Sequence, residues 1–167
     1  MSRPIENIKE KIMAEAQKQL KDVGYNATMI QSIAKACGVG VGTVYNYFSS
    51  KDEIIIACMA DDWKECLSVV KTVSKYAKTY DIVIHCIYDQ LQTFAKKHAY
   101  VFEDAAAAGV DGVLYRQLRH LSQQVSVPLR KFCKSDAEAQ IIAEALLTWI
   151  RTGKSIEEIC SSVEKLF

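Results

Sequence analysis

The chain has 167 residues and a net charge of +1; half of its residues are hydrophobic and a quarter are charged. This composition is typical of a folded chain of one or two small domains, and it excludes intrinsic disorder and a pair of large catalytic domains. The sequence shows no signal segment and no apolar stretch that could span a bilayer. We therefore expect a cytoplasmic protein without a membrane partner.

The charged residues are unevenly distributed along the chain. Residues 1–51 carry seven basic and four acidic side chains, whereas residues 52–167 carry 14 basic and 16 acidic ones. A mildly basic first part and a mildly acidic second part indicate a molecule with two functional regions.

Hydrophobic residues recur at helical spacing from the beginning of the chain, and no strand pattern of useful length occurs. A first amphipathic helix is predicted over about residues 5–23, followed by Gly24. Thr28–Gln31 has the form of a capping box, in which hydroxyl and amide side chains bind exposed backbone N–H groups. This box predicts a short helix that ends at Gly38, where glycine tolerates the positive φ of a sharp turn.

A second short helix is predicted over about residues 41–48. Val44 and Phe48 lie four positions apart, so we expect both side chains to pack inward. Ser50 and Glu53 form another predicted capping box, which opens a longer helix.

The remaining sequence also predicts helices only, with about nine in total, so the predicted fold class is all-α. In chain order these helices cover about residues 51–72, 81–98, 105–108, 112–134, 136–152 and 156–167. Ile82 and Cys86 are expected on an inward face, and Pro128 is expected to interrupt its helix. Ser135 and Ser155 are predicted to cap the last two helices.

Two short helices joined by a glycine turn and carried on a longer helix form a helix-turn-helix pattern. Such a unit places its second short helix in the major groove of DNA. Asn46 suits a base edge, Val41 suits a thymine methyl group, and Gly42 allows close approach of the backbone. Side chains suited to phosphate oxygens are Thr43, Tyr45, Tyr47 and Lys51. The alternatives are that the two tyrosines belong to the core and that the lysine is merely solvated.

Residues 28–53 resemble the DNA-binding motif of tetracycline-repressor-like (TetR family) regulators. The shared pattern, I-A-x-x-x-G-V-x-x-G-T-x-Y-x-Y-F-x-x-K, runs from Ile33 to Lys51. The resemblance implies a bacterial homodimer that represses transcription from a palindromic operator on double-stranded DNA and is released by a small-molecule effector. It implies a DNA-binding domain over residues 1–51 and an effector-binding and dimerisation domain over residues 52–167.

The resemblance also implies roles for single residues. By motif position, the phosphate contacts fall on Thr28, Thr43, Tyr45, Tyr47 and Lys51. The positions that approach bases are Val41, Gly42 and Asn46. The sequence departs from the family at Gly40 and Val41, where many members have a serine and a basic residue. The second short helix therefore lacks the usual side-chain cap and one positive charge.

An effector would need an apolar cavity among the helices that follow the DNA-binding region. The residues predicted to line it are Trp63, Cys66, Tyr88, Leu91, Phe94, Phe102, Tyr115 and Leu118. The alternative for each of them is an ordinary core position. No cofactor is expected, and the effector is expected to be small and apolar.

The last two helices carry more apolar surface than a small monomer hides on one side. Pairing these helices from two subunits would form a four-helix bundle. The predicted interface consists of Ile142, Leu146, Trp149, Ile150, Ile159 and Val163. The alternative is that part of this stripe is intramolecular core.

Two other functional classes remain open. The six cysteines contain no C-x-x-C pair, but Cys133 lies between Lys131 and Lys134 and is the best candidate for a thiol-based redox sensor or a thiol enzyme. A helical interaction module with an inert helix-turn-helix is the other alternative. We expect no enzyme and no metal site, because no Ser-His-Asp or paired-carboxylate arrangement stands out and the three histidines do not cluster.

Overall fold

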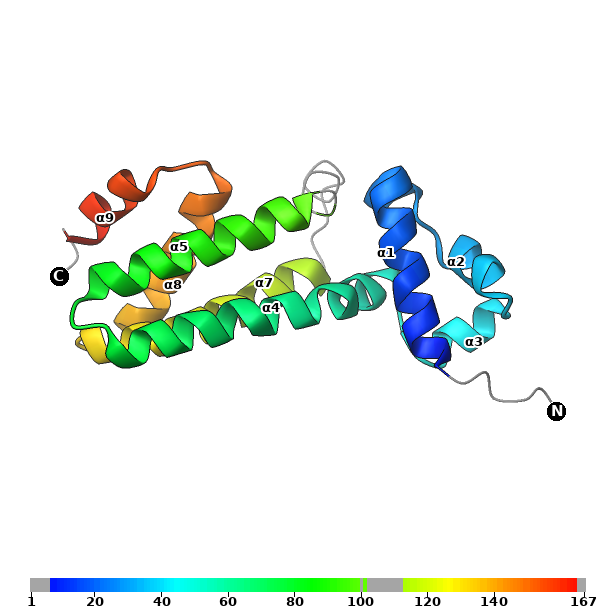
Figure 1. Ribbon diagram of the computed structural model, residues 1–167, viewed down its shortest axis with the longest axis horizontal. Coiled ribbons are helices and arrows are strands. Elements are labelled where there is room, and N and C mark those ends of the chain that lie inside the picture. Colours follow the sequence, from blue (N-terminus) through cyan, green and yellow to red (C-terminus); the bar gives the residue numbers. More distant parts are fainter. Residues whose placement is uncertain (1–6, 100, 102–112, 165–167) are drawn as a thin grey trace. The chain divides into compact units, whose positions relative to one another are not determined.

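The computed structural model of the chain describes residues 7–99, 101 and 113–164 (Figure 1). These residues form eight α-helices and one 3-10 helix, with no strand among them, which confirms the all-α fold class. The elements are α1 (Ile8–Ala27), α2 (Ile30–Cys37), α3 (Val41–Tyr45), α4 (Lys51–Tyr76), α5 (Tyr80–Lys97), α7 (Val113–Ser126), η1 (Val127–Phe132), α8 (Asp136–Arg151) and α9 (Ile156–Glu164). The helix predicted at residues 105–108 lies outside the described residues.

The chain divides into two compact units. The first consists of Met1–Asp61 and His98–Leu114, and the second of Asp62–Lys97 and Tyr115–Phe167. The division falls inside α4, whereas the boundary predicted from the sequence falls at the start of this helix. The first unit thus contains the helix-turn-helix together with the beginning of α4.

The core of the first unit is built from one face each of α1, α2, α3 and the start of α4. Ile12, Ile33, Val44 and Ile54 are fully buried in it, and Phe48 is 3% exposed. The inward positions predicted for Val44 and Phe48 are therefore confirmed. This shared core fixes the two short helices to each other and to α1.

The termini of these helices correspond only partly to the prediction. Gly24 breaks α1 with a φ of 79°, and Gly38 ends α2 with a φ of 70°, both as expected of glycine. The capping box at Thr28 is wrong: Met29 is the N-cap of α2, and no side chain caps this helix. Instead, the Thr28 hydroxyl donates a hydrogen bond of 2.7 Å to the Gly24 carbonyl, which the break in α1 leaves accessible.

α3 ends at Tyr45 and is shorter than the helix predicted over residues 41–48. The Tyr47 amide donates to the Val44 carbonyl, so the chain tightens into a turn after α3 while Phe48 still reaches the core. The Ser50 hydroxyl accepts from the Glu53 amide at 3.1 Å, which confirms one half of the predicted box at α4. The Glu53 carboxylate accepts from the amide and hydroxyl of Ser49 rather than from the amide of Ser50.

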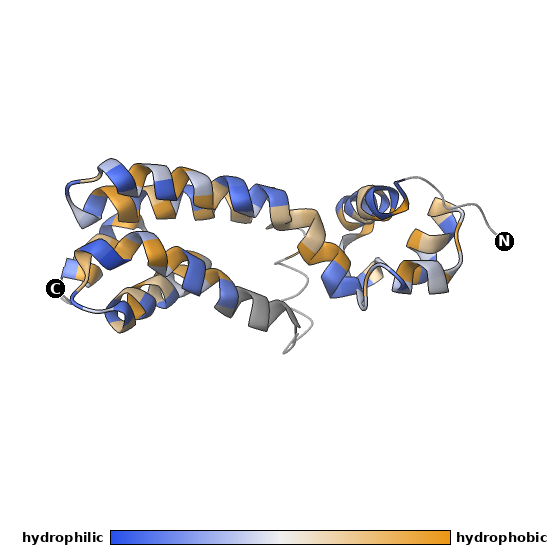
Figure 2. Ribbon diagram, turned by 90° about the horizontal axis from the view of Figure 1, so that it is seen from below, coloured by the Kyte–Doolittle hydropathy of each residue, from blue (hydrophilic) through white to orange (hydrophobic). Residues whose placement is uncertain are grey.

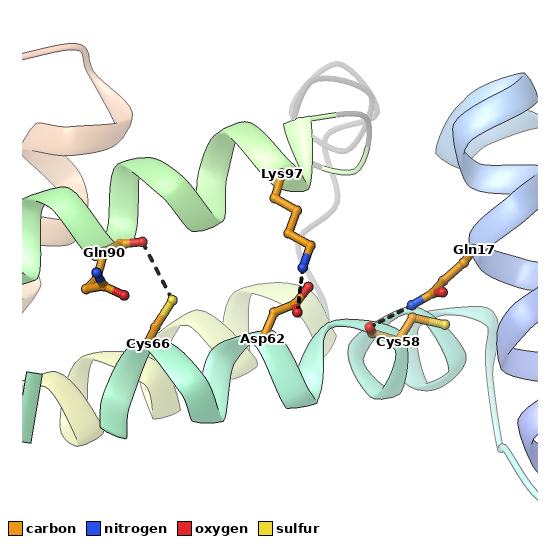
Figure 3. A network of polar contacts seen from close by, with 6 residues as sticks. All are labelled: Gln17, Cys58, Asp62, Cys66, Gln90 and Lys97. Carbon is orange, nitrogen blue, oxygen red and sulfur yellow. Dashed lines mark hydrogen bonds and ion pairs between the residues drawn. The ribbon is translucent and has the colours of Figure 1, made fainter. Parts of the chain in front are cut away.

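In the second unit, α4 and α5 run side by side in opposite directions (Figure 1). Two contacts join them in Figure 3: the Lys97 ammonium lies 2.7 Å from the Asp62 carboxylate, and the Cys66 thiol donates to the Gln90 carbonyl. α8 packs against α5 and η1, and α9 packs against α5 and α8. The apolar residues of these helices gather on their inward faces (Figure 2).

Other predictions for the second unit have mixed outcomes. α7 ends at Ser126 and passes into η1, which has Pro128 near its start, so the expected interruption is confirmed. The Ser135 and Ser155 hydroxyls accept from the amides of the glutamates three positions on, as predicted. The inward position of Ile82 is wrong: its side chain is 48% exposed, because the buried face of α5 is formed by Val83, Ile84, Ile87, Leu91 and Phe94. None of the helices in the described ranges is long and apolar enough to cross a membrane.

Candidate nucleic-acid interface

The segment that follows the glycine turn has one buried and one open side. Val44 and Phe48 hold it to the core, while Tyr45 and Tyr47 are 50% and 44% exposed. A tyrosine combines an apolar ring with a polar hydroxyl group, which can form hydrogen bonds when it is exposed. The local packing therefore presents both phenols to solvent on the side away from the core.

The remaining predicted residues of this segment extend the same open surface. Gly42 and Asn46 are exposed, and Val41 and Thr43 are half-buried. A Cβ built at Gly42 would meet no atom within 4 Å, and at Gly40 only the Thr43 Oγ1 at 4.0 Å. Gly40 also has an ordinary φ of −71°. The fold of the chain thus does not require glycine for space at either position, which leaves the backbone of α3 bare toward solvent.

Two of the residues predicted to contact phosphate, Thr28 and Lys51, already bind other groups of their own chain. Thr28 is 1% exposed, and its hydroxyl is bound to the Gly24 carbonyl. The Lys51 ammonium donates to the Tyr25 carbonyl at 2.8 Å and lies 4.0 Å from the centre of the Tyr25 ring. These two side chains are therefore less accessible to a ligand in solvent than those of Tyr45, Asn46 and Tyr47.

Tyr25 and Asp52, which the sequence did not single out, complete this arrangement. Tyr25 is 7% exposed, and its phenol donates a 2.5 Å hydrogen bond to the Asp52 carboxylate. Burial, together with this bond, raises the pKa of the Tyr25 phenol well above its usual value. Burial lowers the pKa of the Lys51 ammonium, and the nearby Asp52 carboxylate opposes this shift. The signal in the sequence that could have pointed to this contact is a tyrosine directly after the glycine that breaks α1.

A second tie joins α1 to α4 within the first unit. The Gln17 amide donates to the Cys58 carbonyl at 3.0 Å (Figure 3), and the Cys58 thiol donates to the Met13 carbonyl at 3.4 Å. α4 is thus held to α1 near Tyr25 and again near Cys58.

Four of the five predicted effector residues whose side chains the structure describes are packed core. Trp63, Cys66, Leu91 and Phe94 are each at most 8% exposed. The rings of Trp63 and Phe94 meet edge to face at 5.3 Å, and the Trp63 Nε1–H donates to Gln124 at 2.6 Å. Tyr88 is half-buried. The side chains of Phe102, Tyr115 and Leu118 lie outside those that the structure describes.

One hollow on the second unit lies along α4, with a volume of about 530 Å³. It is lined by Lys64, Leu67, Ser68, Lys71, Thr72, Lys75 and Gln124. None of the predicted effector residues is among them. The contact between Trp63 and Gln124 nevertheless links this hollow to the aromatic pair beneath it.

Four of the six residues predicted to form a dimer interface are buried by their own chain. Ile142, Leu146, Ile159 and Val163 are at most 1% exposed, because α8 and α9 turn these side chains toward α5 and toward each other. The burial of these four residues within their own chain agrees with the alternative of an intramolecular core. Trp149 and Ile150 are half-buried. Among the described hydrophobic side chains of α8, Ile141 is exposed, at 61%.

The cysteines do not have the surroundings of reactive thiols. All six are free, and burial raises the pKa of each, to about 11 for Cys58. At Cys133 the nearby Glu138 raises the pKa further. The Lys131 ammonium donates to the carbonyls of Ser74 and Ala77. The flanking lysine that would favour a Cys133 thiolate is thus directed to other partners, which argues against the thiol-sensor alternative.

In the described part of the chain, no three side chains of His, Cys, Asp or Glu come together to hold a metal ion.

Comparison with known proteins identifies the same region. Residues 12–58 match the family model of "Bacterial regulatory proteins, tetR family". The chain is 23% identical over 152 residues to the HTH-type transcriptional repressor KstR of Rhodococcus jostii (strain RHA1), with 84% of this chain and 72% of KstR covered. It is 25% identical over 130 residues to the icaADBC biofilm-operon negative transcriptional regulator IcaR of Staphylococcus aureus (strain Newman), with 75% and 69% covered.

Solved structures show the same fold. A TerR/AcrR family transcriptional regulator from Aquifex aeolicus VF5 matches with a TM-score of 0.58 at 19% identity, over 96% of this chain and 99% of that one. SCO7518 from Streptomyces coelicolor A3(2) matches with a TM-score of 0.68 at 14% identity, over 95% and 97%. The helix-turn-helix, the family match and the regulators to which the chain is similar agree, and the DNA-binding region of this chain, residues 12–58, belongs to the TetR family of bacterial regulatory proteins.

Proposed function

We propose that the protein is a repressor that binds a palindromic operator as a homodimer and is released by a small molecule. The observation that carries the DNA-binding part is the two-sided segment of residues 41–48: an apolar side fixed in the core and an open side with Tyr45, Asn46 and Tyr47. Repression is supported by similarity to KstR, a repressor, and to IcaR, a negative regulator.

On DNA, α3 would enter the major groove and its residues would divide between two tasks. The hydroxyls of Thr43, Tyr45 and Tyr47 would donate to phosphate oxygens and set the register of the protein. Asn46 would bind a base edge, and Val41 would contact a thymine methyl group. The bare backbone at Gly42 would permit the close approach that this reading requires.

The experiment that tests DNA binding is selection of bound duplexes from a random pool with the full chain. We expect two inverted half-sites about 34–36 Å apart, because two recognition helices of a symmetric dimer must enter successive major grooves. Asn46→Ala should relax the preference at particular base pairs, whereas Tyr47→Ala should weaken binding to all sequences alike. Enrichment of no sequence at all would overturn the proposal and favour an interaction module.

For the homodimer, we propose an interface formed by α8 residues other than the buried Ile142 and Leu146. Ile141, Ala145 and Trp149 lie at i, i+4 and i+8 on one side of α8, and Ile141 is 61% exposed. An exposed isoleucine beside an alanine and a half-buried tryptophan forms an apolar stripe that a second α8 can cover.

Sedimentation of the Ile141→Glu variant tests this surface. A charge in a symmetric interface meets its own copy, so we expect the dimer to dissociate at concentrations where the unchanged protein is dimeric. The matched control is Ile82→Glu, which adds the same charge at an exposed isoleucine of α5 and should remain dimeric. A dimer that survives Ile141→Glu would place the interface elsewhere.

Release by a ligand is supported by the continuity of α4, which has residues in both units. A small apolar molecule that packs between α4 and α5 near Trp63 and Phe94 would have to displace their edge-to-face contact. It would weaken operator binding only if it bound the DNA-free state more tightly. Apolar compounds that raise the melting temperature of the protein provide the test: we expect them to lower operator affinity. Unchanged affinity with a bound compound would overturn the release mechanism.

A further inference from the structure

We infer that Tyr25, Lys51 and Asp52 form a latch that positions the DNA-binding surface, and that Lys51 is a positioning residue and not a phosphate ligand. The inference rests on the proposed DNA-binding function. It reverses the role that the motif position of Lys51 implies. We call these three residues the Tyr25 latch.

The first half of the latch is the contact between Lys51 and Tyr25. Tyr25 follows Gly24, whose φ of 79° breaks α1, so the Tyr25 carbonyl is not part of a continuous helix. The Lys51 ammonium donates to this carbonyl at 2.8 Å and also lies 4.0 Å from the centre of the Tyr25 ring. A hydrogen bond to a carbonyl and a cation–π contact thus hold one ammonium group against one residue.

The second half is the bond from Tyr25 to Asp52. The phenol donates to the carboxylate at 2.5 Å, a distance typical of a charge-assisted O–H···O⁻ bond. A tyrosine phenol already keeps its proton at physiological pH, and the environment of Tyr25 raises its pKa further. Because Lys51 and Asp52 are the first two residues of α4, the latch fixes the beginning of this helix.

The position of the latch in the chain explains what it orients. Tyr25 lies in the last turn of α1, shortly before the connection to α2, and Lys51 begins α4, four residues after Tyr47. The two ends of the helix-turn-helix, from residue 25 to residue 52, are therefore tied to each other. The loop on the Tyr25 side is tightened further, since the amide and hydroxyl of Thr28 both donate to the Gly24 carbonyl.

The same contacts leave Lys51 poorly disposed to bind DNA. Reaching a phosphate would require the ammonium to give up the Tyr25 carbonyl and ring. A lysine that neutralises a phosphate adds about 0.9 to the slope of log affinity against log salt concentration, whereas a lysine that only orients its surroundings adds nothing. The salt dependence of binding thus separates the two roles.

The experiment measures binding of the full chain to the duplex selected from the random pool, over a series of salt concentrations. We expect Lys51→Met and Tyr25→Phe each to weaken binding by up to about tenfold, the effect of one hydrogen bond, with the slope unchanged. Asp52→Asn keeps an oxygen that can accept from the phenol, so it should bind more tightly than Asp52→Ala. The variant with both Tyr25→Phe and Lys51→Met should bind DNA more weakly than either single variant. Its loss of affinity should be smaller than the product of the two single losses, because the two side chains act in one latch.

Lys18→Met is the matched control, because it removes one exposed positive charge of the same unit outside the latch. Circular dichroism verifies folding of each variant. If Lys51→Met fails to fold, Tyr25→Phe still tests the inference, because it removes only the phenol hydroxyl and retains the aromatic ring. A slope reduced by about 0.9 in Lys51→Met would overturn the inference and make Lys51 a phosphate ligand. Unchanged affinity of Tyr25→Phe would overturn it as well. Failure of the proposed function is a separate result, since the unchanged protein would then bind no duplex.

Discussion

The two units of this protein differ in how well a local sequence pattern describes their surfaces. In the first unit, α3 and the turn after it expose Tyr45, Asn46 and Tyr47, the side chains expected to face DNA. In the second unit, α8 buries Ile142 and Leu146, which were expected to face another subunit. The difference is one of length scale: a short segment has only one way to bury Val44 and Phe48, whereas an apolar stripe on a long helix can be covered by either its own chain or a partner.

The largest difference in the free energy of unfolding is expected between substitutions of two neighbouring residues in the first unit, Tyr47 and Phe48. Phe48→Ala removes a side chain that is 3% exposed and should lower the free energy of unfolding by about 3–5 kcal/mol. Tyr47→Ala, at a position 44% exposed, should change it by no more than about 0.5 kcal/mol. Denaturant unfolding at a fixed protein concentration measures both. Equal losses would mean that Tyr47 belongs to the core.

The matching contrast in the second unit uses two adjacent isoleucines. Ile142→Ala creates a cavity at a residue 1% exposed and should cost about 2–5 kcal/mol. Ile141→Ala, at 61% exposure, should leave the stability of the isolated subunit within about 0.5 kcal/mol of its original value. Dilute samples, in which the dimer has dissociated, separate subunit stability from association. A large loss for Ile141 in such samples would show that α8 is oriented differently.

Helix caps should have equal effects in the two units, because a cap acts within a few residues. The hydroxyls of Ser50 and Ser135 each accept from the amide three positions on, at 3.1 Å. Replacement of either serine by alanine should lower stability by about 1 kcal/mol. Thermal unfolding of the two variants measures the loss. A much greater effect at Ser50 would indicate that the first turn of α4 does more than cap itself.

The smallest expected effect is a gain in stability at the bare end of α3. Gly40 is its N-cap, and a Cβ there would meet only the Thr43 Oγ1 at 4.0 Å. Gly40→Ser should therefore stabilise the first unit by a few tenths of a kcal/mol, about the usual difference between the two residues at an N-cap. Precise thermal unfolding measures the shift, and DNA binding of the same variant shows whether the bare backbone serves recognition. Destabilisation would contradict the open space seen around Gly40.

Local chemistry made several features of this protein predictable from its sequence. The all-α class followed from helical spacing, the break in α1 and the end of α2 followed from Gly24 and Gly38, and the interruption before η1 followed from Pro128. The open side of α3 followed from the spacing of Val44 and Phe48 and from the family motif. Each of these depends on the conformational preferences of one residue or on the periodicity of one helix.

Tertiary packing decided the rest, because burial depends on neighbours that are distant in the sequence. The apolar stripe of α8 is covered by α5 and α9, and the aromatic residues of the second unit pack against one another. The Thr28 hydroxyl turned to the Gly24 carbonyl, and the Lys51 ammonium turned to Tyr25, which lies 26 residues earlier in the chain. The sequence by itself determined the helical pattern and predicted which side chains would bind DNA, and only the tertiary structure decided which of those side chains already have a partner within the chain.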